Sequence, residues 1–523
     1  SMNCRSSVSF AQGWVGCKPT KSNGNRTRNR PCHDINKWET FKKYCMRDVD
    51  VERQIADKLK MYPISDEEHR LYVLDQIIND RGVLVDCELA GQAVKLNSIQ
   101  TAVAVEQAYM ITGLENPNSV TQLKQWLKEN GVEIESLSKK AVKSLADETD
   151  GDVSEMLKLR LLMAKTSVKK YEAVIRSVCS DNRVHGMMRF CGANRTGRWS
   201  GNILQPQNLP QNHLPDLTLA RDIVKDGDFE MLDMMFGNVP NVLSELIRTV
   251  LITKPNHRFI VADFSAIEAR VLAWIAGEQW RIDTFRNGGD IYCASASKMF
   301  KVPVEKHGVN GELRQKGKIS ELACGYGGSV GALKNMGAVE MGVQENELQG
   351  LINDWRNANP HIVRFWYEVG NAAMKAIKEK TTVPLGKLVF AYERGILFIR
   401  LPSGRRLSYI KPRIGTNRFG GDSITYMGIN SAKKWDRLET FGGKLTENIV
   451  QGTARDLLAN ALINAANAGY DTVFHVHDEI ICEVPNGYGS VDELCKLMCI
   501  KPEWADGLPL NADGFECEYY KKE

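Results

Sequence analysis

The alternation of apolar and polar positions divides the chain into blocks with different expected structure. Residues 38–60 and about 64–180 have helical spacing, with TQLKQWLKENG and EMLKLRLLMAKTSVKKYEAVIRSV as clear helices. From about 184 short strand-like runs mix with helices, about 279–380 is again helical, and the mixture returns from about 385. We therefore expect an α+β core that is interrupted by a helical insertion and preceded by another helical module.

The segment FHVHDEII (474–481) places two adjacent acids between two short apolar runs. The flanking runs are typical of buried strands, and Asp478 and Glu479 lie between them at hairpin spacing. An acid pair at such a tip is ordinarily a solvated turn. A carboxylate that emerges from buried strands is disfavoured by desolvation, however, unless a cation or hydrogen-bond donors compensate its charge. The segment is therefore a candidate metal site if a second acid has a similar setting.

The segment HRFIVADFSAIEARVLAWIAGE (257–278) supplies that second acid. Residues 259–262 indicate a buried strand that Asp263 ends, and an apolar-faced helix follows. Ser265 and Glu268 have the spacing of a helix capping box, so Asp263 could also merely precede a helix. Two such carboxylates facing each other could instead hold two divalent ions about 3.5–4 Å apart, which suits in-line displacement at phosphorus. Hard oxygen ligands favour Mg²⁺ or Mn²⁺.

The segment LRQKGKISELACGYGG (313–328) combines cations with an aromatic ring on one face of a predicted helix ended by its last two glycines. The residues that recur every four positions on this face are Arg314, Lys318, Leu322 and Tyr326. The cations would lie in the first turns, where free N–H groups and the helix dipole favour anions, and the tyrosine about 18 Å further along. This pattern suits a nucleoside triphosphate, although an ordinary surface helix with a basic turn would also produce it.

Composition narrows the class of protein only a little. The 523 residues are 43% hydrophobic and 25% charged, which is typical of a globular protein with two to four domains. A formal net charge of +4 is too small to indicate nucleic acid, so a polyanion site would be a local basic surface. The thirteen cysteines form no C-x-x-C pair, and Cys495 and Cys499 are more typical of a helix core than of metal ligands. The scattered cysteines indicate reduced thiols and an intracellular protein. No apolar run reaches membrane-spanning length, so we expect no membrane partner.

Together these segments resemble the motifs of one enzyme family. DFSAIEAR (263–270), R-x3-K-x7-YG (314–327) and HVHDE (475–479) resemble motifs A, B and C of the family A (DNA polymerase I-like) DNA polymerases. TGRWSGNILQPQNLP (196–210) and ENIVQGTARDLL (447–458) resemble its TGR…QN segment and its N-x3-QG-x-A helix. Five motifs in order are a specific signal, which extends over about 64–523. KKWDRLETFGGKLTENIVQ is similar to the phage and prophage branch.

The resemblance implies a right-hand polymerase fold, in which the palm has an antiparallel sheet and the fingers and thumb are helical. It assigns 64–185 to the thumb, 186–278 and 425–523 to the palm, 279–424 to the fingers and 1–63 to a truncated exonuclease-domain remnant. It implies template-directed, primer-dependent DNA synthesis from dNTPs by two-metal-ion nucleotidyl transfer on primer–template DNA. We expect a monomer in the cytoplasm of a bacterium or phage-infected host, working with replication accessory proteins.

The same resemblance implies roles for the acids. Asp263 and Asp478 would be the ligands of two Mg²⁺ ions, for which Mn²⁺ could substitute. The backbone carbonyl of Phe264 would complete one coordination shell, and Glu479 would be a secondary ligand. Asp478 would also help to activate the primer 3′-hydroxyl.

The nucleotide would contact the basic helix. Arg314 and Lys318 would bind the triphosphate, with Lys318 as a candidate proton donor to the leaving pyrophosphate. Glu268, hydrogen-bonded to Tyr326, would exclude a ribose 2′-hydroxyl. Leu322 departs from the family, which has Phe or Tyr at this position. A leucine keeps apolar contact with the sugar but lacks the ring on which sensitivity to dideoxynucleotides depends in the family.

Further residues would face the DNA. Those expected to read the minor groove or the primer end are Arg198, Gln207, Asn208, Asn448, Gln451 and His477. A buried core histidine is the alternative reading of His477. The 155–178 helix offers a phosphate-tracking face, made by Lys158, Arg160, Lys165, Lys169 and Lys170.

The segment YCMRD resembles the last motif of the 3′–5′ exonuclease domain that precedes the polymerase fold in this family. Its Tyr44 and Asp48 would need a D-x-E pair and a further acid upstream, because two metal ions require several carboxylates. The acids ahead of Tyr44 are Asp34 and Glu39, and neither forms such a pair. We therefore expect a polymerase without proofreading, whose first 60 or so residues are a vestige or a truncation product.

Two other functions remain open from the sequence. A single-subunit RNA polymerase shares Asp, Lys, Tyr and Asp at similar places, but Glu268 speaks against it because a carboxylate near C2′ excludes ribose. A catalytically silent DNA-binding replication scaffold would not need Asp263, Lys318 and Asp478.

Overall fold

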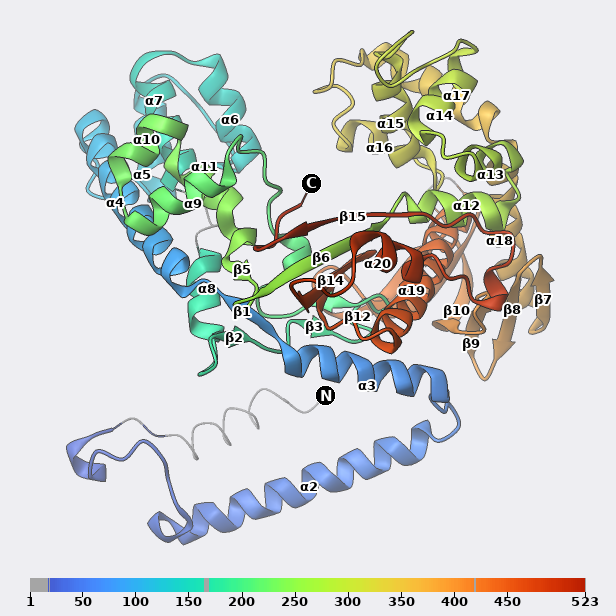
Figure 1. The fold of residues 1–523 in the computed structure, drawn as a ribbon, viewed down its shortest axis with the longest axis horizontal. Helices are drawn as coiled ribbons and strands as arrows, with labels where there is room; N and C mark the ends of the chain where they lie inside the picture. The colour runs from blue at the N-terminus through green and yellow to red at the C-terminus, as the bar shows by residue number, and fades with distance from the viewer. Residues whose placement is uncertain (1–16, 18, 164–168, 418–419, 523) are drawn as a thin grey trace. The chain divides into compact units, whose positions relative to one another are not determined.

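The computed structural model describes residues 17, 19–163, 169–417 and 420–522. The chain divides into two compact units, residues 1–70 and 71–523. The second unit combines helices with antiparallel sheets, which confirms the expected α+β class (Figure 1). Within the described ranges, no helix is long and apolar enough to cross a membrane, and the twelve cysteines there are free thiols.

The first unit is built around helix α2 (Ile35–Leu59), close to the helix predicted over 38–60. Asp34 caps it, because its side chain accepts a hydrogen bond from the backbone N–H of Lys37 at 2.9 Å. Two short 3-10 turns precede it, η1 (Lys21–Asn23) and η2 (Pro31–His33). All of α2 is described, and none of its residues is buried.

The second unit carries both candidate acids on one four-stranded antiparallel sheet of order β13–β14–β6–β15. Its strands are β6 (His257–Phe264), β13 (Thr472–Val476), β14 (Glu479–Pro485) and β15 (Ala512–Cys517). As predicted, β13 and nearly all of β14 are buried on both faces. The hairpin turn is His477–Asp478, one residue earlier than expected, so Glu479 already belongs to β14. Likewise β6 extends one residue past Asp263.

Helices α19 (Gly442–Asn467) and α20 (Val491–Met498) contact this sheet, and α12 (Ile267–Ala276) packs on α19. Their apolar side chains share one core with Ile260 and Ile480 of the sheet. Burial of such side chains stabilises the fold by about 1.5–3 kcal/mol each. The N-terminus of α19 lies so close to the turn at Tyr326 that a Cβ atom on Gly443 would clash with the carbonyl oxygen of Tyr326.

The segment after α12 is helical, as expected for about 279–380. Its elements are α13 (Gln279–Arg286), α14 (Ile291–Phe300), α15 (Leu313–Cys324), α16 (Val330–Asn335), η5 (Glu345–Glu347), α17 (Leu348–Ala358) and α18 (Pro360–Glu379). A buried ion pair ties α13 to α15, with Arg281 Nη2 2.5 Å from Glu321 Oε2. The indole N–H of Trp355 in α17 donates to the same carboxylate at 2.9 Å.

A six-stranded antiparallel sheet follows, in the order β12–β11–β10–β9–β8–β7. Its strands are β7 (Thr382–Leu385), β8 (Leu388–Glu393), β9 (Ile396–Arg400), β10 (Arg406–Thr416), β11 (Asp422–Ile429) and β12 (Trp435–Thr440). One face packs on α18 and α19. The expected boundary between 279–424 and 425–523 falls within β11.

The remaining elements precede β6 or connect the sheets. The helices are α3 (Asp66–Arg81), α4 (Cys87–Thr112), α5 (Val120–Glu129), α6 (Lys139–Glu148), α7 (Gly151–Met163), α8 (Lys169–Ser177), α9 (Leu217–Asp226), α10 (Phe229–Phe236) and α11 (Val239–Leu246). The short strands are β1 (Val83–Val85), β2 (Arg183–Val184), β3 (Met188–Arg189), β4 (Ser200–Gly201) and β5 (Leu251–Ile252), and the 3-10 turns are η3 (Pro206–Asn208), η4 (Ile247–Val250) and η6 (Glu503–Ala505). The helix predicted over 155–178 is seen as α7 and α8, and Lys165 between them lies outside the described residues.

Candidate active site

The pairing of β6 with β14 brings the two candidate acids together. In this pairing Asp263 lies directly opposite Glu479, the residue after Asp478. The backbone N–H of Phe264 donates to the carbonyl oxygen of Asp478 at 3.2 Å, which ties the strand end to the hairpin turn. Asp263 and Asp478 are therefore neighbours in space, as the sequence predicted.

The environment of these carboxylates disfavours negative charge. Burial, and then repulsion by Asp478, raise the pKa of Asp263. Burial also raises the pKa of Asp478, although the cations of Arg198 and Lys522 oppose the shift. Among the described residues, Asp263 Oδ1 is buried and has no hydrogen-bond partner. Two hard oxygen donors that repel each other, one of them unsatisfied, fit a divalent cation.

The segment after β15 reaches the same acids. Lys522 Nζ lies 3.7 Å from Asp263 Oδ2 and 3.5 Å from Glu479 Oε2. The hydroxyl of Tyr520 donates to Glu479 Oε1 at 2.7 Å, and Arg248 donates to that hydroxyl at 3.0 Å. Burial raises the pKa of Glu479 despite these partners. Sequence reasoning missed Lys522 and Tyr520, because no local pattern links them to the acids.

Glu268 in the first turn of α12 contacts two residues that are distant in sequence. Its Oε1 accepts a hydrogen bond from Arg198 at 2.8 Å, and its Oε2 accepts one from Tyr326 at 2.7 Å. The capping box predicted with Ser265 is wrong, because the serine hydroxyl donates to another carboxylate and the N-cap residue is Ala266 with φ 51°. The contact with Tyr326 implied by the family resemblance is present.

Helix α15 carries three of the residues predicted for the nucleotide. It ends at Cys324, so the predicted end at the glycine pair is wrong, and Tyr326 lies in the turn that follows. Leu322 is 51% exposed on this helix. Lys318 is half-buried, and none of the ion pairs in the described part of the chain involves it.

Arg314 in the first turn of α15 already has an anionic partner. Two of its N–H groups donate to Asp290 Oδ2, at 2.9 and 2.8 Å, and its guanidinium lies 5.2 Å from the centre of the Tyr292 ring. Hydrogen bonding to Asp290 raises the pKa of Arg314. A guanidinium has five N–H donors, so three remain for an additional anion.

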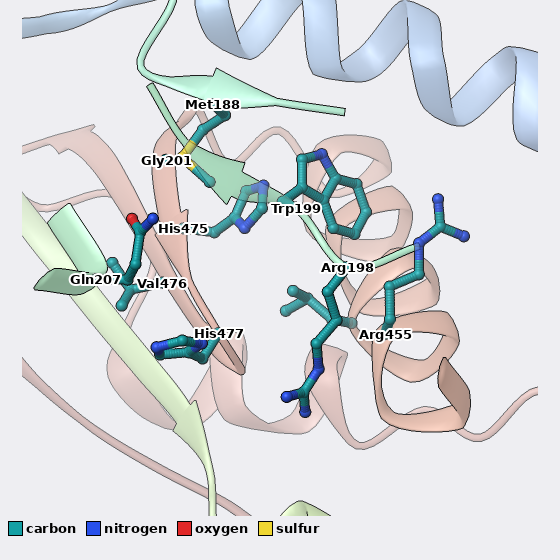
Figure 2. A pocket seen from close by; sticks show the side chains of 10 residues that line it. Met188, Arg198, Trp199, Gly201, Gln207, Arg455, His475, Val476 and His477 are labelled. Atoms are coloured by element: carbon teal, nitrogen blue, oxygen red, sulfur yellow. The ribbon is translucent and has the colours of Figure 1, made fainter. Parts of the chain in front are cut away.

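A small pocket of about 20 Å³ lies beside the hairpin turn (Figure 2). Three of the six residues predicted to contact DNA line it, namely Arg198, Gln207 and His477. His477 is exposed and adopts φ 55°, so the alternative of a buried core histidine is wrong. In αL, histidine is among the more tolerated non-glycine residues.

The other three predicted residues lie elsewhere. Asn448 on α19 is buried and donates to the hydroxyl of Tyr409 at 2.9 Å. Gln451 is half-buried, also on α19. Asn208 is exposed at the end of η3, and its carbonyl accepts a hydrogen bond from Lys170 at 2.7 Å. The described structure thus joins some of the predicted DNA-contacting residues but not all.

A polar and aromatic cluster behind the pocket was not found from the sequence. The rings of His475 and Trp199 meet edge to face with centroids 4.7 Å apart. The indole N–H of Trp199 donates to Asp75 at 2.8 Å, and the guanidinium of Arg455 lies 4.8 Å from its ring centre. Burial, reinforced by Arg455, lowers the pKa of His475 to about 3. Alternation in HVH would place His475 and His477 on the same face, so it could not show that His477 lies in the hairpin turn after β13 while His475 is buried in the strand.

Comparison with known proteins identifies the family. The sequence model of DNA polymerase family A matches residues 89–501. The DNA polymerase of Bacillus phage SP02 is 52% identical over 512 residues, 97% of this chain and 79% of the phage protein. DNA polymerase I of Rhizobium leguminosarum is 29% identical over 46% of this chain and 20% of its own length. The thermostable DNA polymerase I of Thermus aquaticus is 27% identical over 50% of this chain and 27% of its own length.

A solved structure has the same fold. It is the POL domain of Pol1 from M. smegmatis, in complex with DNA primer-template and dNTP, with a TM-score of 0.61 and 20% sequence identity. The alignment includes 99% of this chain and 79% of that one. The phage relative and the family match together show that this chain belongs to DNA polymerase family A, in its phage branch, and is a DNA-directed DNA polymerase.

Proposed function

We propose that the chain extends a DNA primer along a template from dNTPs, with Asp263 and Asp478 holding two divalent ions. The observation that carries this proposal is the pairing of β6 with β14, which makes the two carboxylates neighbours and leaves Asp263 Oδ1 buried without a partner among the described residues. When bound, Mg²⁺ or Mn²⁺ would stabilise the charge that develops on the attacking and leaving oxygens.

Other groups at the strand ends complete the proposed site. The backbone carbonyl of Phe264 would add an oxygen ligand next to Asp263. Asp478 would accept the proton of the primer 3′-hydroxyl. Glu479 has both oxygens engaged, by Tyr520 and Lys522, so we assign it a secondary role that holds the acids in position.

The nucleotide would lie along α15. Lys318, which has no ion-pair partner in the described residues, would bind the triphosphate and give a proton to the leaving pyrophosphate. Arg314 would add its free donors while Asp290 orients it. Leu322 would make apolar contact with the sugar, and its exposure leaves it available for such a contact.

Sugar selection would depend on Glu268. Its carboxylate is held at both oxygens, by Arg198 and Tyr326, so it is fixed as a wall beside the sugar. A fixed carboxylate near C2′ favours dNTPs and speaks against an RNA polymerase. The primer–template duplex would lie against Arg198, Gln207 and His477, with Asn208, Asn448 and Gln451 further along its path. We also propose that the thumb is formed by 64–185, the fingers start at 279, and the chain does not proofread.

Primer extension with and without Mg²⁺ tests the proposal. Parent chain should extend a labelled primer only with the ion, and Asp263→Ala or Asp478→Ala should lose at least about a thousandfold in rate, since metal stabilisation is worth several kcal/mol. Asp283→Ala, which removes an exposed acid from α13, serves as the control. DNA affinity should stay near that of the parent. Either active-site variant extending at the parent rate would refute the assignment.

A further inference from the structure

The six-stranded sheet concentrates positive charge that the rest of the chain lacks. Residues 382–440 contain eleven lysines and arginines against four acids, a surplus of seven. The other 464 residues contain 57 lysines and arginines against 60 acids. The small net charge of the chain therefore hides a local basic surface, which is the kind of surface that a polyanion requires.

The structure shows which face of the sheet is free. Apolar side chains of one face, such as Ile399, Leu407 and Ile424, pack on α18 and α19. Because side chains alternate along a strand, their neighbours point the other way. This outer face presents four arginines, one each from β9, β12 and two from β10, namely Arg400, Arg437, Arg406 and Arg413.

Two arginines of the outer face are close enough to repel each other. Arg400 and Arg406 lie directly opposite in the β9–β10 pairing, where like charges are destabilising. Arg406 has one acidic partner, Glu393, at 3.2 Å. Among the described residues, neither Arg400 nor Arg413 has an ion-pair partner, and both are exposed. An anion between such groups would remove the repulsion, and guanidinium binds phosphate with two parallel hydrogen bonds.

Exposed apolar groups lie on the same face. Trp435 on β12 is 57% exposed, and it pairs with Ile429 on β11, which is 48% exposed. An exposed tryptophan on the same face as arginines is a platform on which bases can stack, and base stacking needs unpaired bases. We propose that this face, defined by Arg400, Arg406, Arg413, Arg437 and Trp435, binds single-stranded DNA.

The other face of the sheet connects this surface with the active site. Arg405, at the turn before β10, donates to Asp456 on α19 at 2.6 Å, and Tyr409 accepts from Asn448 on the same helix. A single strand on the outer face would therefore lie across the sheet from α19, the helix that we assign to the duplex. We take this strand to be the unpaired part of the template, and only this identification rests on the proposed function.

The test measures binding apart from synthesis. Fluorescence anisotropy with labelled oligo-dT and with a blunt DNA duplex would be recorded for the full chain over a range of KCl concentrations. For Arg400→Gln/Arg413→Gln, the slope of log K against log salt for oligo-dT should fall by about 1.4, about 0.7 for each lost phosphate contact. Trp435→Ala should bind oligo-dT about fivefold or more weakly.

The control is Lys496→Gln/Lys501→Gln, which removes two positive charges at exposed positions in and after α20. It should bind oligo-dT as the parent does, and all variants should bind the blunt duplex equally. An unchanged slope in the arginine variant, or an equal loss on the duplex, would overturn the proposal. A parent chain that binds oligo-dT through this face but extends no primer would instead refute the proposed function alone.

Discussion

Removal of the Glu268 carboxylate should relax the choice of sugar. Glu268→Ala takes away the side chain that Arg198 and Tyr326 hold at 2.8 and 2.7 Å, and leaves open space at the start of α12. A ribose 2′-hydroxyl would then meet no carboxylate. We expect the preference for dNTP over rNTP to fall, with little change in the rate of dNTP insertion.

The hydrogen bond from Tyr326 to Glu268 sets the expected loss of sugar discrimination in a second variant, Tyr326→Phe. Tyr326→Phe removes one of the two donors that fix the carboxylate. A hydrogen bond to a charged group is worth about 1.5–3 kcal/mol, so loss of this one should reduce sugar discrimination by roughly 10- to 150-fold at most. In the Glu268→Ala background Tyr326→Phe should add nothing, because its partner is already gone.

The assay is single-nucleotide insertion on one primed template, with kcat/KM measured for a dNTP and for the matching rNTP. The ratio of the two values gives discrimination as a free energy. Asp283→Ala on neighbouring α13 is the matched control, since it removes an exposed acid whose side chain contacts Arg286 and Gln279 of the same helix. An unchanged ratio in a folded Glu268→Ala variant would refute the role of this carboxylate. Additive effects of the two substitutions would refute their coupling.

Three further predictions concern stability and proofreading. The pKa of His475 is about 3 in the folded chain against an ordinary 6.5, so its contribution to stability is present above pH 6.5 and is lost on acidification towards 3. One pH unit below 6.5, the free energy of unfolding should fall by about 1.4 kcal/mol. In urea unfolding, His475→Gln should lose correspondingly less stability on acidification than the parent. Equal losses in the two proteins would contradict this role of His475. Glu321→Gln leaves buried Arg281 without its ion pair and should cost about 3–5 kcal/mol, whereas Glu347→Gln, at an exposed pair, should cost less than about 1 kcal/mol by the same measurement. With Mg²⁺ and without dNTPs, a labelled mismatched primer should keep its length; shortening that Asp48→Ala abolishes would reveal a nuclease site.

Local sequence patterns predicted the parts of the site that short segments determine. The apolar runs around Asp478 and before Asp263 identified β6, β13 and β14. The boundaries of β13 and β14 were right to within one residue, and β6 begins two residues before the predicted start. These runs are buried on both faces, so their apolar character is continuous and easily seen. The long helix α2 was also visible from its periodicity, although it begins three residues before the predicted start at 38.

Predictions failed where a tertiary contact outweighed a local pattern. Ser265 and Glu268 have capping-box spacing, yet both side chains bond to residues distant in sequence, and the turn at Ala266 replaces the cap. The glycine pair after Tyr326 did not mark the helix end, because α15 stops earlier and a turn brings the tyrosine to Glu268. The expected boundary at 424/425 falls inside β11, because strand pairing is not visible in the sequence of one strand.

The register between β6 and β14 decides whether the acids can act together. A shift by one residue would turn Asp263 to the opposite face of the sheet. Burial on both faces means that the apolar pattern of β14 cannot fix this register by itself. The contacts that fix it are the Phe264–Asp478 backbone hydrogen bond and the bonds of Glu479 with Tyr520 and Lys522. The segment after β15 is therefore part of the active site in a physical sense, since it holds in place the strand pairing on which the carboxylates depend.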